Sequence, residues 1–340
     1  MPFIDELLRY DSVSIVGLEK NTGKTECLNY LLKRVAPAGK NLAVTSVGLD
    51  GERVDQVTGT AKPEIFLREG VLFATSEKHY KMRGVHAEIL DIGDHSGSLG
   101  RLITARALTP GKILLSGPST TNGLKEWMDK VRLTHKTDLC IIDGALSRLS
   151  QASPAVSSSM ILTTGAALSL NINHLVFKST FVINLVKLPV TRHPMAGSLK
   201  DYGRGAWLLN DSEVLYRLYS DTPEENNPAG RDIIDSANAI FIGGALTDRL
   251  LKKISADFKD KGTEVIIRDF TRVFASERSV YDFTRGGGAL SVLQRSHLIA
   301  ICVNPLAPNG AILNSDRLCK ELEAATGLPA YDIMKTNHET

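Results

Sequence analysis

The sequence lacks a strong charge of either sign. Its 40 Lys and Arg residues stand against 38 Asp and Glu residues, which leaves a formal net charge of +2. Proteins that bind nucleic acid or an anionic membrane surface commonly carry a marked basic excess, because phosphate groups attract it over long distances. The near balance gives no support to either class, so we predict no nucleic-acid partner and no membrane partner.

Long apolar runs are also missing. No run approaches the roughly 20 apolar residues that a membrane-spanning helix needs. The first residues, MPFIDELLRYD, carry acidic side chains where a secretory signal would carry basic ones. Both features predict a cytoplasmic protein.

Cysteine is scarce, and proline is spread thinly. The four cysteines, Cys27, Cys140, Cys302 and Cys319, are far apart and form no CxxC pair. This pattern suggests neither a zinc site nor a disulfide framework, so each thiol is predicted to be a small buried apolar group. With 43% hydrophobic and 23% charged residues, the composition is that of a globular protein.

Short apolar runs alternate with helix-like segments along most of the 340 residues. Such alternation predicts a largely parallel sheet that is covered by helices on both faces. The stretch Leu188–Ala206 is rich in proline and glycine and has no periodicity, so it is either a linker or a functional loop. The alternation then resumes, with strands expected at Ala239–Ile242, Glu264–Ile267 and His297–Val303. We therefore expect an α/β domain at residues 1–189 and a second, smaller α/β domain at residues 190–340, which has a substrate, partner or regulatory role.

One stretch carries the strongest functional signal. A β-branched strand, Val13–Gly17, runs into the loop GLEKNTGKT, and leucines at helical spacing follow from Glu26 to Val35. A triphosphate requires backbone N–H groups at the positive end of a helix, with a lysine and a hydroxyl added. A glycine turn followed by chance by a lysine is the alternative. We predict a P-loop, in which Lys24 contacts the β- and γ-phosphates and Thr25 binds Mg²⁺. The residues assigned to nucleotide binding are Gly17, Lys20, Asn21, Thr22, Gly23, Lys24, Thr25 and Glu26.

The spacing of this loop is informative. Five residues separate Gly17 from Gly23, whereas the common P-loop has four between its glycines. The longer spacing resembles the loop of dethiobiotin synthetase and the cobyrinic acid amide synthases, a class that also holds MinD-type ATPases and the signal-recognition GTPases. The resemblance implies a P-loop NTPase domain. Members of this class often use an early loop lysine across a homodimer interface. Lys20 stands one position away from that lysine, so it is either its counterpart or a solvated loop residue.

A second element supports the resemblance. The stretch LCIIDGA, Leu139–Ala145, is a buried-strand pattern that ends in an acid followed by Gly-Ala. It is similar to the strand-E-G-A element of dethiobiotin synthetase, in which the carboxylate binds Mg²⁺, and Asp143 fills that position. The alternative is an aspartate that caps the next turn.

A third candidate lies in TSVGLDGE, Thr45–Glu52, which closes the second predicted strand. Ligands gather outside the carboxyl ends of parallel strands, so Asp50 is assigned to the metal together with Thr25 and Asp143. An Asp-Gly turn explains the same residues equally well. Lys24, Asp50 and Asp143 are the predicted catalytic residues.

Two functions follow from these predictions. The first is an ATP-dependent synthetase that activates a carboxylate, as the resemblance to dethiobiotin synthetase implies. The second is an ATPase that couples its nucleotide state to a partner protein, as a chaperone or reactivase does. GLEKNTGKT, TSVGLDGE and IIDGAL together resemble P-loop proteins associated with cobalamin-dependent amino-acid aminomutases, which favours the second function, with Mg²⁺ and ATP as cofactors. A nucleotide-binding scaffold with little turnover is the third interpretation. No N-K-x-D guanine signature occurs, so ATP is preferred over GTP.

Overall fold

The computed structural model describes residues 2–35, 39–47, 64–145, 153–154, 156–219, 231–258, 262–332 and 334–335. The chain forms two compact units. Unit 1 comprises Met1–Thr180 together with His297–Thr340, and unit 2 comprises Phe181–Ser296. Within the described ranges, no helix combines the length and the apolar character that crossing a membrane requires.

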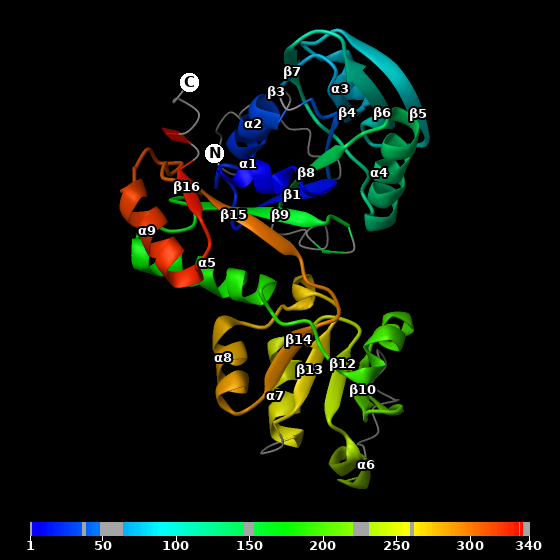
Figure 1. The fold of residues 1–340 in the computed structure, drawn as a ribbon, viewed down its shortest axis with the longest axis vertical. Coiled ribbons are helices and arrows are strands. Elements are labelled where there is room, and N and C mark those ends of the chain that lie inside the picture. The colour runs from blue at the N-terminus through cyan, green and yellow to red at the C-terminus, as the bar shows by residue number, and fades with distance from the viewer. Residues whose placement is uncertain are drawn as a thin grey trace. The chain divides into compact units, whose positions relative to one another are not determined.

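Unit 1 is built on a nine-stranded sheet with the order β16-β15-β9-β1-β8-β2-β4-β6-β5 (Figure 1). The strands from β16 to β4 run parallel to their neighbours, whereas β6 and β5 add an antiparallel edge. The α/β class and the largely parallel sheet predicted from the sequence are therefore confirmed. The strands are β1 (Ser12–Gly17), β2 (Leu42–Ser46), β4 (Leu72–Ser76), β5 (Ala87–Gly97), β6 (Gly100–Ala107), β8 (Leu139–Ala145), β9 (Ser159–Gly165), β15 (His297–Asn304) and β16 (Ala330–Asp332). A small antiparallel pair, β3 (Ile65–Leu67) and β7 (Gly111–Ile113), lies outside this sheet.

The helices of unit 1 are α1 (Pro2–Leu7), α2 (Lys24–Val35), α3 (Glu77–Lys81), α4 (Thr121–His135), α5 (Ile172–Val186), which continues into unit 2, and α9 (Ser315–Thr326). Side-chain hydroxyls and amides define where several of these helices begin. The side chains of Ser76, Thr120 and Asn314 each accept a hydrogen bond from the backbone N–H three residues on, at the first turns of α3, α4 and α9. Such caps satisfy N–H groups that have no partner inside the helix.

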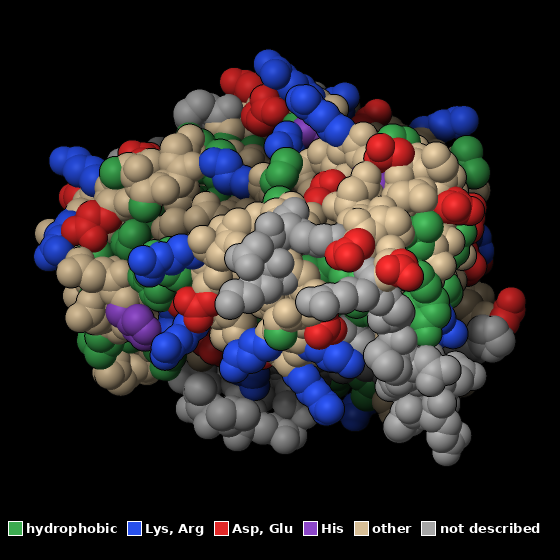
Figure 2. All heavy atoms as spheres, turned by 90° about the horizontal axis from the view of Figure 1, so that it is seen from below, with side chains coloured by type: hydrophobic (Ala, Val, Ile, Leu, Met, Phe, Trp, Pro, Cys, Tyr) green, Lys and Arg blue, Asp and Glu red, His purple; other side chains and the backbone are tan. Residues whose placement is uncertain are grey.

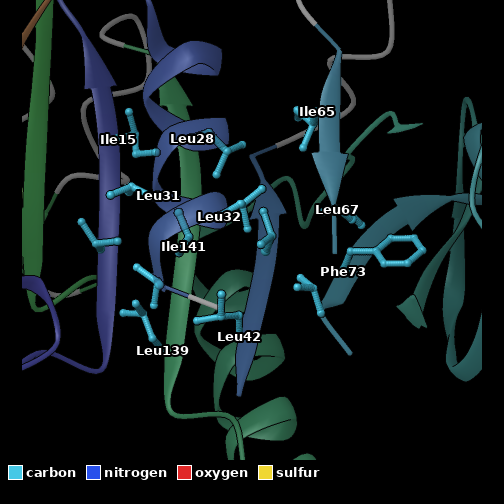
Figure 3. Close-up of a cluster of buried hydrophobic side chains, with 14 of the residues drawn as sticks. Ile15, Leu28, Leu31, Leu32, Leu42, Ile65, Leu67, Phe73, Leu139 and Ile141 are labelled. Atoms are coloured by element: carbon cyan, nitrogen blue, oxygen red, sulfur yellow. The ribbon is translucent and has the colours of Figure 1, made fainter. Parts of the chain in front are cut away.

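Two apolar layers cover the two faces of the central strands. The leucines of α2 pack against Leu42 and Val44 of β2 and against Leu139 and Ile141 of β8 (Figure 3). The intervening residues, Ala43, Cys140 and Ile142, belong to the other layer, which includes Leu124, Trp127 and Met128 of α4. Since successive side chains of a strand point to opposite faces, α2 and α4 define opposite faces of the sheet.

The end of the chain returns to the first sheet. β15 pairs with β9, and β16 pairs with β15, so residues 297–340 group with unit 1. The sequence-based division at residue 189 assigned them to the second domain instead. β9 occupies Ser159–Gly165, where no strand was predicted from the sequence, and α5 begins at Ile172.

Unit 2 has its own five-stranded sheet with the order β11-β10-β12-β13-β14. β12, β13 and β14 are parallel, and β10 and β11 extend the sheet in antiparallel fashion. Its strands are β10 (Ala206–Leu209), β11 (Val214–Tyr219), β12 (Ala239–Ile242), β13 (Glu264–Ile267) and β14 (Ala289–Val292). Its helices are α6 (Arg231–Ser236), α7 (Asp248–Asp257), α8 (Glu277–Arg285) and the short 3-10 helices η3 (Pro194–Asp201) and η5 (Phe270–Arg272). The stretch Leu188–Ala206 thus contains an ordered helical turn.

Charged side chains of both signs are interspersed on the face of the molecule shown in Figure 2. Lys and Arg lie among Asp and Glu there instead of forming one continuous basic area. That mixture agrees with the small formal charge of +2.

Candidate functional site

The loop between β1 and α2 has the backbone of a tight, glycine-dependent turn. Gly23 has a φ of 92° and Asn21 a φ of 61°, which is the left-handed region that glycine and asparagine tolerate best. Lys24 begins α2, and the N–H of Cys27 donates to the carbonyl of Gly23 at 2.9 Å. The predicted strand, loop and helix therefore occur in the expected order, with Lys24, Thr25 and Glu26 in the first helical turn.

Gly17 allows the loop to fold back over the end of β1. A Cβ atom at this position would lie 2.5 Å from Thr22 Oγ1 and 2.9 Å from Lys24 Nζ. Both separations are below normal van der Waals contact, so any larger residue would displace one of these side chains. The Lys24 ammonium group is thus held above the last residue of β1, at the N-terminal end of α2. A helix N-terminus with a lysine beside it attracts phosphate groups.

Strand β9, which pairs with β1, holds the loop through two hydrogen bonds to Thr163. Thr22 Oγ1 donates to the carbonyl of Glu19 at 2.9 Å and lies 3.0 Å from Thr163 Oγ1 of β9. Because Thr22 has a single hydroxyl proton, Thr163 is the donor in the second bond. The carbonyl of Thr163 also accepts from the N–H of Leu18 at 2.9 Å. Thr22 and Thr163 are both fully buried, so the hydrogen bond between their hydroxyls is shielded from water.

A third contact comes from the returning end of the chain. Asn304, the last residue of β15, donates from Nδ2 to the carbonyl of Asn21 at 3.1 Å. Its Oδ1 accepts from the N–H of Leu306 at 3.1 Å, which fixes the orientation of the amide. Neither Thr163 nor Asn304 is among the residues predicted from the sequence. The available signal was that each apolar strand ends in polar residues, TTG after SMIL and N after AICV, at the edge where the loop was expected.

Asp143 lies on the strand next to the loop. β8 sits between β1 and β2, and Asp143 is in register with Ile15 on one side and with Ser46 on the other. Leu139 and Ile141 of the same strand face α2, so alternation places Asp143 on the α2 face as well. The pKa of the Cys27 thiol, in the first turn of α2, is raised by its hydrogen bond to Cys302, by burial and by the negative charge of Asp143. The carboxylate therefore acts electrostatically on the start of α2.

The remaining predicted residues differ in their exposure and in whether the structure describes them. Lys20 and Glu19 are exposed, and the N–H of Lys20 donates to Glu19 Oε1 at 2.9 Å. Thr25 and Glu26 are partly exposed at the start of α2. Asp50, assigned to the metal and to catalysis, lies outside the described residues.

The donors present suit a magnesium nucleotide. Mg²⁺ takes oxygen ligands and is commonly held by one or two protein groups, phosphate oxygens and water. Among the described residues, no group of three or more His, Cys, Asp or Glu side chains is arranged to hold a metal ion by itself. Thr25 on α2 and Asp143 on the α2 face of β8 offer the oxygen ligands that a phosphate-bound Mg²⁺ needs.

No protein-family model matches this chain, and a search of the curated proteins finds no match.

Proposed function

We propose that the protein is a Mg²⁺-dependent P-loop ATPase that couples its nucleotide state to a partner protein. One observation carries the proposal. The loop between a buried parallel strand and a 12-residue helix holds Lys24 Nζ over Gly17, with the carboxylate of Asp143 on the adjacent strand. Backbone N–H groups, an ammonium group and a carboxylate so arranged match the recurring parts of phosphoryl-transfer sites.

Each residue has a defined part in this proposal. Lys24 binds the β- and γ-phosphates and neutralises charge that develops on them. Thr25 and Asp143 hold the metal, which supplies further positive charge next to the phosphates when it is bound. Thr163 and Asn304 keep the loop in its phosphate-binding shape. Asp50 remains a proposed contributor to the metal site.

The partner function is supported by how the chain is divided. Unit 2, Phe181–Ser296, is inserted in the chain between the two segments of unit 1, Met1–Thr180 and His297–Thr340. β15 begins at His297, directly after unit 2, and ends at Asn304, which contacts the phosphate loop. We propose that a change in the loop on nucleotide binding reaches unit 2 through β15, the strand that directly follows unit 2 in the chain. The resemblance of the motifs implies a cobalamin-dependent aminomutase as the partner, and we propose the cytoplasm as the location.

A carboxylate-activating synthetase is the second candidate. The feature that favours it is the close approach of another segment to the same sheet edge. A Cβ atom at Gly117 would lie 1.7 Å from the carbonyl oxygen of Ser46, so the segment before α4 packs directly on the end of β2. Side chains there could contact a small substrate beside the phosphates.

Phosphate release from ATP and from GTP, measured with and without Mg²⁺, tests the proposal. Lys24→Ala should abolish nucleotide binding or turnover, whereas Lys33→Ala, an exposed lysine in the last turn of the same helix, should leave both unchanged. Normal hydrolysis by Lys24→Ala would refute the assignment. Turnover that rises with the large-molecule fraction of a cell extract supports the partner function, and turnover that requires the small-molecule fraction supports the synthetase.

A further inference from the structure

A buried serine, Ser46, lies next to Asp143 and has no evident structural role. Ser46 is the last residue of β2, and its side chain is 6% exposed. Its Oγ atom is fully enclosed, and no hydrogen-bond partner for it exists in the described part of the chain. A buried hydroxyl without a partner destabilises a folded protein, because it has given up hydrogen bonds with water. Such an atom calls for an explanation, and a ligand absent from the structure is one.

The orientation of Ser46 follows from its strand. Leu42 and Val44 of β2 pack in the layer that contains α2, and Ala43 packs in the layer that contains α4. Alternation therefore directs the Ser46 side chain to the α2 face. The preceding residue confirms this direction, since Thr45 Oγ1 lies on the other side, 2.4 Å from where a Cβ of Gly117 would be.

Ser46 and Asp143 are direct neighbours across the sheet. Their Cα atoms are paired in the parallel register of β2 and β8, and both side chains are on the α2 face. Adjacent strands lie about 4.8 Å apart, so side chains paired in this way reach the same small group or ion. Thr25 lies in the first turn of α2, the helix whose leucines cover this face of the sheet.

We propose that the Ser46 hydroxyl hydrogen-bonds a water molecule of the Mg²⁺ that Thr25 and Asp143 hold. This inference rests on the proposed nucleotide function and adds a residue to its metal site. Mg²⁺ gives up its hydration water reluctantly and keeps several water ligands in proteins, and each of these is a strong hydrogen-bond donor. An acceptor that is buried, uncharged and free of other partners among the described residues is suited to one of them. The hydroxyl then gains on metal binding the hydrogen bond that it lacks without metal.

The test compares Ser46→Ala with Ser14→Ala. Ser14 is a matched control because it is a fully buried serine in β1 whose side chain faces away from α2 and contacts Ser157 Oγ at 2.8 Å. A fluorescent non-hydrolysable ATP analogue is titrated in EDTA and then at increasing Mg²⁺, and the melting temperature of each nucleotide-free variant is measured. Residues that hydrogen-bond metal-bound groups commonly change metal affinity about 10- to 100-fold, so half-saturation by Mg²⁺ should rise by such a factor in Ser46→Ala.

Two further readouts separate this role from a structural one. Affinity in EDTA should be unchanged in Ser46→Ala, and its melting temperature should equal or exceed that of the wild type, because an unsatisfied hydroxyl has been removed. Ser14→Ala should melt earlier and keep the wild-type Mg²⁺ dependence. Unchanged Mg²⁺ dependence in Ser46→Ala, or a lower melting temperature without metal, would overturn the role of Ser46 while the nucleotide proposal stands. A wild-type protein that binds no nucleotide would overturn both.

Discussion

Replacing Thr163 by valine isolates the contribution of β9 to the loop between β1 and α2. Valine has nearly the shape of threonine, so the substitution removes the hydroxyl that donates to Thr22 Oγ1 at 3.0 Å and leaves the packing in place. Thr22 keeps its hydrogen bond to the carbonyl of Glu19 at 2.9 Å. No buried donor loses its partner, and the expected cost is that of one hydrogen bond.

The loss of this one hydrogen bond sets the size of the expected effect on binding and on stability. A buried neutral hydrogen bond contributes a net of about 0.5 to 1.5 kcal/mol. If that free energy holds the loop in its binding conformation, its loss weakens nucleotide binding by about 2- to 12-fold. The free energy of unfolding should fall by the same small amount. A fluorescent nucleotide titration and urea unfolding measure the two quantities on the same samples.

Thr164→Val is the matched control. Thr164 is the next residue, is equally buried, and its Oγ1 lies 2.8 Å from Ser179 Oγ of α5. Thr164→Val should therefore lose similar stability without changing nucleotide affinity. Equal losses of affinity in the two variants, or an unchanged affinity in Thr163→Val, would refute the role of β9 in shaping the loop.

Two other substitutions test the loop and the core. Gly17→Ala should weaken nucleotide binding at least about 10-fold and lower the free energy of unfolding by about 1 to 3 kcal/mol, because its Cβ would collide with Thr22 Oγ1. The control is Gly197→Ala, whose new Cβ has no atom within 4 Å and should change neither quantity. Equal nucleotide titration curves and equal unfolding curves for the two variants would contradict this prediction. Burial raises the pKa of the Cys140 thiol from 9.0 to about 12. The contribution of the neutral Cys140 thiol to the free energy of unfolding is therefore complete below pH 9 and is lost as the pH rises toward 12. Cys140→Ala should flatten the alkaline decline by up to about 1.4 kcal/mol per pH unit in urea unfolding between pH 8 and 10.5, and a parallel decline would contradict that assignment.

The local parts of the site were predictable because their signals are contiguous. Strand, glycines, lysine and helix follow one another within Val13–Val35, so periodicity and turn chemistry sufficed for the loop. The strand at Leu139 was also predicted, and its pairing next to β1 puts Asp143 beside the loop strand. The nucleotide and metal roles themselves remain predictions.

The non-local parts were not predictable in the same way. Asn304 is 283 residues from Asn21, and only the return of β15 to the first sheet brings them together. Apolar periodicity predicts a strand at His297 but does not indicate which sheet it joins. β9 was not predicted because its apolar run, SMIL, is short, and periodicity alone does not distinguish so short a run from part of a helix.

The polar residues at the carboxyl edge divide into two sets on either side of β1. Toward β9 and β15, Thr163 and Asn304 hydrogen-bond the loop itself, which fixes its shape without any ligand. Toward β8 and β2, Asp143 and Ser46 are paired on the face that α2 covers, and the Ser46 hydroxyl has no partner in the described chain. Packing alone would favour apolar residues at positions 143 and 46, because buried polar groups add stability only when their hydrogen bonds are made. A site that must hold its loop rigid on one side and receive a hydrated cation on the other accounts for this asymmetry. The Mg²⁺ dependence of nucleotide binding by Ser46→Ala measures the contribution of the cation side directly.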